Sequence, residues 1–416
     1  MPLTKVIMEI STAGCKTICV PAPSEADYRK LIKNARTFRH FLDALIEKYP
    51  ELFPAEISKG YWLHDCVHSK KLNITTRRIK LATTQAVYQV RPDFALPYMA
   101  GMTDKVEKAL YLRRFGVPLD ALTYVFGHNP IYWHRLHQSL GRLSIVGTTV
   151  KDPDSIPLNL VADEKHSWRL GERVFIPTTF GSGSFLGMDI VQSAETPDLV
   201  KGYGCFRDEV LALNPDYKPE TVNIDGWDHT QAAWHQLFAG IAIILCFLHS
   251  VLNIQKRCRK NKVLWKKLTG RLWHLYKAPS KRHFAQRLRW LRDWAKAKVK
   301  QPSILKKLVN LKGKSKQFQV AYDYPEGART SNMLDRLMNY QDRLLYTMQY
   351  FHGSEEAARQ YLRSVALIWN FHPYGKRTTA TDPDRCSPFK DLNGFVYHEN
   401  WLRNLLIAGS MNGYRH

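Results

Sequence analysis

The sequence predicts an α/β protein with a mixed sheet, a basic helical insertion within the domain of that sheet, and a mainly helical N-terminal region. Three observations predict this class. Between residues 155 and 255, short apolar strands alternate with helical stretches. After residue 255 the composition changes to a segment rich in lysine, arginine and helix-forming residues. Residues 101–150 carry the patterns of short amphipathic helices.

The length and composition are those of a folded globular protein. With 416 residues the chain is long enough for two or three domains, each with its own core. Apolar residues make up 44% of the chain and charged residues 24%, which is usual for such proteins. The patterns divide the chain into six regions, namely 1–100, 101–150, 155–255, 256–322, 323–372 and 373–416.

The net charge is strongly positive and is concentrated in one segment. The chain has 61 Lys+Arg against 37 Asp+Glu, a formal charge of +24. Between Lys256 and Lys316 there are 22 lysines and arginines and a single acid, Asp293, so this segment carries +21. Such a surplus indicates binding to a polyanion, with nucleic acid favoured over an anionic membrane.

The sequence also bears on the compartment of the protein. The N-terminus lacks a charged region followed by an apolar one, so no export signal is expected. The longest apolar run, Leu237 to Leu248, is too short to span a bilayer. Seven cysteines at irregular spacing do not form a disulfide framework. We therefore expect a reducing, cytoplasmic location, associated with the nucleoid if the source is bacterial.

Residues 1–100 predict a region of mixed short elements. A helical stretch runs from Ala26 to Tyr49, and a basic, strand-like segment, TTRRIKLATTQAVYQV, follows later. Several cysteines and histidines in this region could be imagined as a zinc site, namely Cys15, Cys19, His64, Cys66 and His68. Their spacing fits no standard zinc pattern, so buried thiols and surface histidines are the favoured interpretation.

Residues 101–150 predict a helix-turn-helix-like unit. One helix starts near Asp104 and ends near Gly116, and a second, short helix is closed by Gly127. Asn129-Pro130 then starts a third helix, with asparagine as N-cap and proline at the first position. The third helix is the candidate for reading DNA. Its candidate contacts are His134, Arg135, His137 and Gln138. Plain helical packing is the alternative.

Residues 155–255 predict the first part of a catalytic core. The segments NLVAD, RVFIPTTF and FLGMDIVQS are three strands joined by short turns, and a helix follows from Pro197 to Leu213. TVNIDG is a fourth strand, HTQAAWHQLF a helix, and AIILCFLH a fifth strand. This order of three strands, helix, strand, helix and strand is that of the ribonuclease H fold.

Residues 256–322 predict a helical insertion that binds DNA. Basic residues alternate there with Trp265, Trp273, Trp290 and Trp294, which suits neutralisation of phosphates and stacking on exposed bases. The chosen phosphate contacts are Lys281, Arg282, Arg287 and Arg289. A solvated helical face and an amphipathic membrane helix are the alternatives. Residues 323–372 close the core with two helices, Leu334 to about Tyr350 and Glu355 to Trp369, and 373–416 form a polar tail.

Three aspartates predict a divalent-metal site. Asp163 and Asp225 end the first and fourth strands, which are adjacent in this sheet, and Asp335 lies at the start of a helix. Carboxylates from separate elements can hold paired Mg²⁺ ions, which stabilise the attacking and leaving oxygens of a phosphodiester exchange. The local competitors of the third acid are Asp323, Glu326 and Asp342.

The order of these motifs resembles a known family. Asp163, Asp225, Cys246-x-x-His249 and Thr330-Ser331-Asn332-x-x-Asp335 are similar to the motifs of the DDE/DDD transposases of the Mutator type and their bacterial insertion-sequence relatives. The resemblance covers roughly residues 158–370. One departure is the last acid, which is an aspartate here where many relatives carry glutamate. Both residue types ligate Mg²⁺, and the shorter aspartate requires the helix to lie closer.

The resemblance implies a function and a set of partners. It implies a polynucleotidyl transferase that cleaves DNA strands and transfers them with two Mg²⁺ ions, for which Mn²⁺ can substitute. The partners would be double-stranded DNA, both terminal inverted repeats and target, and further copies of the chain in the DNA complex. Cys246 and His249 would lie near the site as positioning residues and not as metal ligands. The alternatives are a domesticated transposase that regulates by binding DNA, and another ribonuclease H-like nuclease such as a resolvase.

Overall fold

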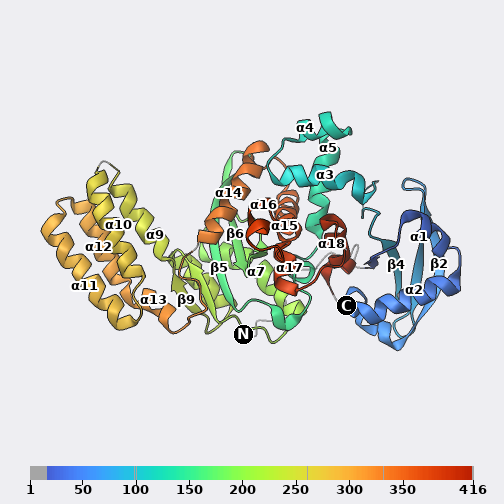
Figure 1. Cartoon of the computed structure of the whole chain (residues 1–416), viewed down its shortest axis with the longest axis horizontal. Coiled ribbons are helices and arrows are strands. Elements are labelled where there is room, and N and C mark those ends of the chain that lie inside the picture. The colour runs from blue at the N-terminus through green and yellow to red at the C-terminus, as the bar shows by residue number, and fades with distance from the viewer. Residues whose placement is uncertain (1–15, 98, 100, 260, 331, 415–416) are drawn as a thin grey trace.

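The computed structural model describes residues 16–414 except 98, 100, 260 and 331, and for residues 332–336 it describes the backbone alone. The strands among the described residues form two sheets, one of four strands and one of five. Figure 1 shows an elongated molecule with the five-stranded sheet near the middle, the four-stranded sheet towards one end and a helical bundle at the other. We call these sheets the central sheet and the N-terminal sheet.

The N-terminal sheet has the strand order β1-β4-β3-β2, with β1 parallel to β4 and the other pairs antiparallel. Its strands are β1 (Thr17–Val20), β2 (Tyr61–Ser69), β3 (Ile74–Leu81) and β4 (Val87–Pro92). The helical elements between β1 and β2 are α1 (Glu25–Leu31), α2 (Ala35–Lys48), η1 (Pro50–Leu52) and η2 (Ala55–Lys59). The described part of residues 1–100 therefore contains both strands and helices, in keeping with the mixed short elements expected from the sequence, and its β-branched and aromatic residues favour the strands.

The helices expected in residues 101–150 are present. They are α3 (Thr103–Arg114), α4 (Leu119–Phe126) and α5 (Pro130–Ser139), followed by η3 (Leu140–Arg142), α6 (Ile145–Thr149) and η4 (Pro153–Ser155). The start of α5 follows the predicted capping chemistry, since Asn129 Oδ1 accepts a hydrogen bond from the backbone N–H of Tyr132 at 2.7 Å.

The central sheet has the strand order β7-β6-β5-β8-β9. The antiparallel part consists of β5 (Asn159–Arg169), β6 (Glu172–Gly181) and β7 (Ser184–Met188), and β8 (Thr221–Ile224) and β9 (Ala242–Leu245) extend it with parallel pairs. In the register of β5 and β8, Val161 lies opposite Asn223. The chain is therefore α/β with mixed sheets, as the sequence predicts.

Helices cover both faces of the central sheet. Leu160 and Ala162 of β5 share a core cluster with residues of α7 (Thr196–Leu213) and α8 (Asp228–Leu237). Val161, between them in sequence, belongs instead to the cluster formed by α14 (Asn332–Thr347) and α15 (Glu355–Phe371). Because successive strand residues point to opposite faces, Asp163 faces the side of α14 and Glu164 the side of α7.

The basic segment forms the helical bundle at one end of the molecule (Figure 1). Its elements are α9 (Phe247–Arg257), α10 (Lys262–Tyr276), α11 (Lys281–Lys298), α12 (Pro302–Gly313), α13 (Ser315–Gln319) and η5 (Val320–Tyr322). Leucines at helical spacing, such as Leu268, Leu272 and Leu275 of α10, form its buried interior. Among the described residues, no helix has both the length and the apolarity to cross a membrane.

The C-terminal segment, which in sequence is polar and turn-rich until the apolar stretch NWLRNLLIAGS, packs against the rest of the protein. It forms α16 (Lys376–Thr381), α17 (Pro388–Asn393), α18 (Trp401–Ala408) and η6 (Ser410–Gly413). Ser410 Oγ donates to the carbonyl of Leu52 at 2.7 Å and accepts from the N–H of Cys19 at 3.1 Å. Arg403 of α18 forms an ion pair with Asp104 of α3. This segment therefore joins the N-terminal sheet to the α3–α5 unit.

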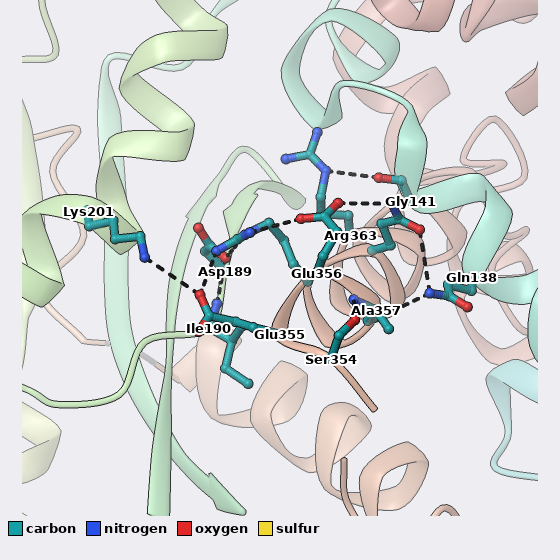
Figure 2. A network of polar contacts seen from close by, with 12 residues as sticks. Gln138, Gly141, Asp189, Ile190, Lys201, Ser354, Glu355, Glu356, Ala357 and Arg363 are labelled. Carbon is teal, nitrogen blue, oxygen red and sulfur yellow. Dashed lines mark hydrogen bonds and ion pairs between the residues drawn. The ribbon is translucent and has the colours of Figure 1, made fainter. Parts of the chain in front are cut away.

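Two arginines of α15 contact the central sheet and the segment after α5, and Figure 2 labels one of them, Arg363, beside Gly141. Arg359 Nε lies 2.6 Å from Asp189 Oδ1, just beyond β7. Arg363 donates to the carbonyls of Gly141 and Leu143 at 3.0 and 2.9 Å, and it forms an ion pair with Glu209 of α7. Burial raises the pKa of Asp189, and the Arg359 charge opposes that rise. Because these charges are buried and paired, loss of one partner is strongly destabilising.

Candidate active site

Asp163 and Asp225 lie close together in the central sheet, at the edge formed by the carboxyl ends of the parallel strands β8 and β9. Val161 of β5 is paired with Asn223 of β8, the neighbouring parallel strand. Asp163 comes two residues after Val161, and Asp225 comes two residues after Asn223. The sequence predicted that Asp163 ends its strand, and this is wrong. Strand β5 continues to Arg169 by pairing with β6 alone. Asp163 instead occupies the position beside the end of β8, where the parallel pairing stops.

The turn after β8 presents Asp225 to solvent. The strand residues Thr221–Ile224 are all buried, whereas Asp225 is exposed. Asp225 Oδ1 accepts a hydrogen bond from the N–H of Trp227 at 2.9 Å, a side-chain turn typical of aspartate. Gly226 has φ +89, and an added Cβ would lie 3.0 Å from Leu245 Cδ2. The Asp-Gly dipeptide is therefore needed here for conformation and for space.

Cys246 and His249 lie beyond the fifth strand. The sequence predicted that β9 would include both, but β9 ends at Leu245, Cys246 is the N-cap residue of α9, and His249 is in the first helical turn. The N–H of Cys246 donates to the carbonyl of Ile224 at 2.7 Å, so the start of α9 adjoins the residue before Asp225.

The environment of His249 is electronegative. Burial lowers the pKa of His249. The hydrogen bond with Cys246 and the charges of Cys246, Asp163 and Asp225 outweigh this effect and raise the pKa to about 9. A protonated imidazole beside two carboxylates can donate a hydrogen bond. This agrees with a positioning role for His249.

Glu164 supports the site from the opposite face of β5. Its Oε1 accepts hydrogen bonds from Tyr203 OH at 2.8 Å and Thr230 Oγ1 at 2.6 Å. Burial raises the pKa of Glu164 to about 7, the two hydrogen bonds oppose the rise, and the charges of Asp163 and Asp225 add to it. Sequence reasoning did not select Glu164 as a site residue. Its signal was an acid next to Asp163 in an apolar strand.

The third acid is placed by its backbone alone. Asp335 is in the first turn of α14, and its side chain is outside the described part of the chain. The segment leading to α14 passes the ends of β8 and β9, since Asn223 Nδ2 donates to the carbonyl of Ala328 at 2.9 Å and Phe247 N–H to that of Arg329 at 3.2 Å. The helix therefore begins near the edge that carries Asp225.

The competing acids have other positions. Asp342 forms an ion pair with Lys165 of β5 at 2.6 Å, and Asp323 forms one with Lys281 at 2.6 Å. Glu326 is exposed in the loop before α14. These placements leave Asp335 as the candidate whose backbone starts α14 at the site.

The donor atoms of the site suit Mg²⁺. Asp163 and Asp225 offer hard carboxylate oxygens, and the negative charges of both carboxylates raise the pKa values of Glu164 and His249. The side chains that the structure describes include no group of three or more His, Cys, Asp or Glu residues arranged to hold a metal ion. The third acid is not among those side chains.

The predicted phosphate contacts of the insertion divide into two kinds. Arg282 and Arg289 are exposed and lie seven positions apart on α11, so they share one face of that helix. Lys281 is paired with Asp323, and Arg287 donates to the carbonyl of His274 at 2.7 Å. Trp290 is 55% exposed, whereas Trp265, Trp273 and Trp294 are partly buried. The insertion therefore offers Arg282, Arg289 and Trp290 to a ligand.

The predicted reading helix, α5, uses much of its surface for packing. His137 is 1% exposed, its Nδ1 lies 2.6 Å from Ser364 Oγ, and its ring stacks on Tyr361 of α15. His134 also stacks on Tyr361, and Gln138 Nε2 donates to the carbonyl of Ala357 at 3.4 Å. The expectation that His137 contacts bases is corrected, because a side chain so buried cannot reach a groove. Arg135 is exposed.

Among the described residues, Cys19 is separated from the histidines and the cysteine of β2. Cys19 is buried in β1, whereas His64, Cys66 and His68 are on β2, at the other end of the sheet order. Cys15 lies outside the described residues.

Comparison of the chain with family models and with curated proteins finds no match.

Proposed function

We propose that the chain is a DNA transposase of the three-aspartate type. Its central sheet would act as a ribonuclease H-like catalytic domain, with two Mg²⁺ ions held by Asp163, Asp225 and Asp335. The observation that carries this proposal is the position of Asp163 on β5 and of Asp225 directly after β8, each two residues beyond the paired residues Val161 and Asn223 of these parallel strands. Converging carboxylates on a rigid sheet edge are what two-metal phosphodiester chemistry requires.

The topology supports the choice of fold. An antiparallel three-strand unit, β5 to β7, is extended by two parallel strands on the side of β5. A ribonuclease H-like sheet has this arrangement. The return of the chain through α14, after the insertion, would bring Asp335 towards the face of β5 that bears Asp163, since Asp342 of the same helix pairs with Lys165 of β5.

The residues of the chain would have distinct parts in the reaction. Asp163 and Asp225 hold the metals, and Mg²⁺ would supply charge neutralisation and activation of the attacking oxygen when bound. Glu164, fixed by Tyr203 and Thr230, stiffens β5 beneath Asp163. His249 would donate a hydrogen bond to a DNA phosphate. No side chain needs to act as a covalent nucleophile.

The DNA would be held at two surfaces away from the site. The exposed face of α11 would neutralise phosphates of any sequence through Arg282 and Arg289. Arg135 on α5 is the exposed candidate for reading terminal inverted repeats. Transposition joins two element ends to target DNA, so we expect further copies of the chain in the DNA complex.

The test is a cleavage assay on cognate DNA. The DNA flanking the gene is searched for short inverted repeats, and a duplex carrying one repeat is incubated with the purified chain and Mg²⁺. Cleavage at the repeat end that leaves a 3′-hydroxyl, followed by joining to a plasmid, would support the proposal. Binding of the repeat without cleavage in Mg²⁺ or Mn²⁺ would contradict it and indicate a DNA-binding regulator.

A further inference from the structure

One lysine of the basic insertion reaches the catalytic edge of the central sheet. Lys314, between α12 and α13, donates a hydrogen bond from Nζ to the carbonyl of Gly226 at 3.2 Å. Gly226 directly follows Asp225 in the turn after β8. The ammonium group therefore contacts the residue that directly follows Asp225, a proposed metal ligand.

The contact belongs to a small junction between the insertion and the site. Gln231 Nε2 donates to the same Gly226 carbonyl at 3.3 Å, and Gln317 Nε2 donates to Gln231 Oε1 at 3.4 Å. An added Cβ on Gly226 would lie 3.2 Å from Lys314 Nζ. The junction thus holds Lys314 close to the backbone of the turn.

The charge of Lys314 is not neutralised by the described side chains. Lys281 and Lys165, by contrast, each have a carboxylate partner at 2.6 Å. Among the described residues, the recorded acceptor of Lys314 is a neutral carbonyl, which occupies one of the three N–H donors of an ammonium group. A half-buried cation with free donors beside an acidic site is suited to an anionic oxygen of a substrate.

We propose that Lys314 binds the phosphate at the reacting position of the DNA and stabilises its negative charge during strand cleavage. The proposal rests on the transposase function proposed above. The carboxylates approach the phosphate through metal ions, and Lys314 supplies a cation from the insertion side. A preformed donor aimed at developing charge acts more strongly in the reaction than in binding.

The test compares Lys314→Met with Lys314→Arg and with Lys218→Met as a matched control. Lys218 is exposed before β8, at the opposite end of the strand that leads to Asp225. At saturating cognate duplex, Lys314→Met should lower the cleavage rate by about 10²–10³-fold, the usual effect of losing one such donor. Lys314→Arg should recover part of the rate, and Lys218→Met should cleave like the wild type.

A modified substrate separates phosphate contact from support of the turn. A methylphosphonate at the cleaved position removes the negative charge that Lys314 would meet. It should slow both proteins, because the metal ions lose the same charge in each, but it should slow the wild type by a larger factor than Lys314→Met. Full additivity of the two defects would overturn the proposal, because the lysine would then act only through the turn.

The two proposals fail in different ways. Wild-type cleavage with an inactive Asp225→Asn and a fully active Lys314→Met would overturn the role of Lys314 and leave the transposase proposal standing. Absence of cleavage by the wild type, or full cleavage by Asp225→Asn, would remove the transposase proposal itself. Equal melting temperatures of Lys314→Met and the wild type would show that a lost rate is not a loss of folding.

Discussion

The ammonium of Lys165 on β5 and the carboxylate of Asp342 on α14 form an ion pair at 2.6 Å. Lys165 is two residues beyond Asp163 on the same face of the strand, so this pair fixes α14 over the strand that carries the first acid. Asp335 lies two helical turns before Asp342 on the backbone of the same helix. The pair therefore aligns the start of α14 with the site.

This arrangement predicts different outcomes for two aspartates of α14. Asp335→Asn should abolish cleavage because two-metal chemistry fails without an anionic ligand. Asp342→Asn should retain substantial cleavage and lose only about 0.2–1 kcal/mol of unfolding free energy, since its carboxylate is largely exposed. Cleavage rates and urea unfolding measure the two effects. An active Asp335→Asn together with an inactive Glu326→Gln would show that the third acid is Glu326.

The first two acids should separate catalysis from binding. Asp163→Asn and Asp225→Asn should each abolish strand cleavage and joining while leaving the affinity for end DNA largely unchanged, because the phosphate contacts lie on α11. Gel-shift titration and a strand-transfer assay on the same preparations check this. Strand transfer at the wild-type rate by either variant would remove that residue from the catalytic set.

The exposed face of α11 should control general affinity. Replacement of Arg282 and Arg289 with serine should weaken binding to all DNA sequences alike and lower the log–log salt slope by about two. The control is Lys70→Ser with Lys71→Ser, which removes the same charge from an exposed turn of the N-terminal sheet. Adding Lys281→Ser and Arg287→Ser should reduce the slope less per residue, because both side chains are engaged within the protein. A loss confined to cognate ends would make this helix the reader.

His249 and Cys246 should affect activity through position. His249→Ala should reduce cleavage and leave the Mg²⁺ dependence unchanged, because the protonated ring is a donor near the site and not a ligand. Cys246→Ser should have a milder effect, since its backbone contact with Ile224 is retained. Metal analysis of the purified protein is the check: stoichiometric zinc that both variants lose would make the pair a structural metal site.

Local patterns in the sequence predicted the strands and the acid at the end of β8. The short run Thr221–Ile224, with β-branched residues at three of its four positions and Asp-Gly after it, is typical of a strand followed by a turn. The end of β5 could not be predicted in this way. Whether the strand stops at Asp163 depends on its pairing partner, and β6 continues beside it after β8 has ended.

Long-range packing accounts for most of the errors. His137 carries a polar ring on an amphipathic helix, and only the approach of α15 with Tyr361 and Ser364 decides that it is buried. The contacts of Ser410 with Cys19 and Leu52 likewise join residues far apart in the sequence and could not be predicted from it. Glu164 and Lys314 carry no motif of their own. Their relevance comes from the strand face in one case and from a contact across the fold in the other.

Recognition of the terminal-repeat sequence by α5 should depend on Arg135. Arg135 is exposed, and a good bidentate contact to a base contributes about 1–3 kcal/mol of discrimination. Arg135→Ala should therefore narrow the affinity gap between terminal-repeat and random DNA without changing the melting temperature. Competition binding with the two DNAs measures the gap.

His137→Ala is the matched comparison on the same helix. It removes a buried ring that stacks on Tyr361 and bonds Ser364, so it should lower stability, and any loss of DNA binding should follow the loss of folded protein. If Arg135→Ala leaves the affinity gap intact, α5 does not read the ends. In that case the expectation of a reading helix in residues 101–150 fails, and these helices serve to pack against α15.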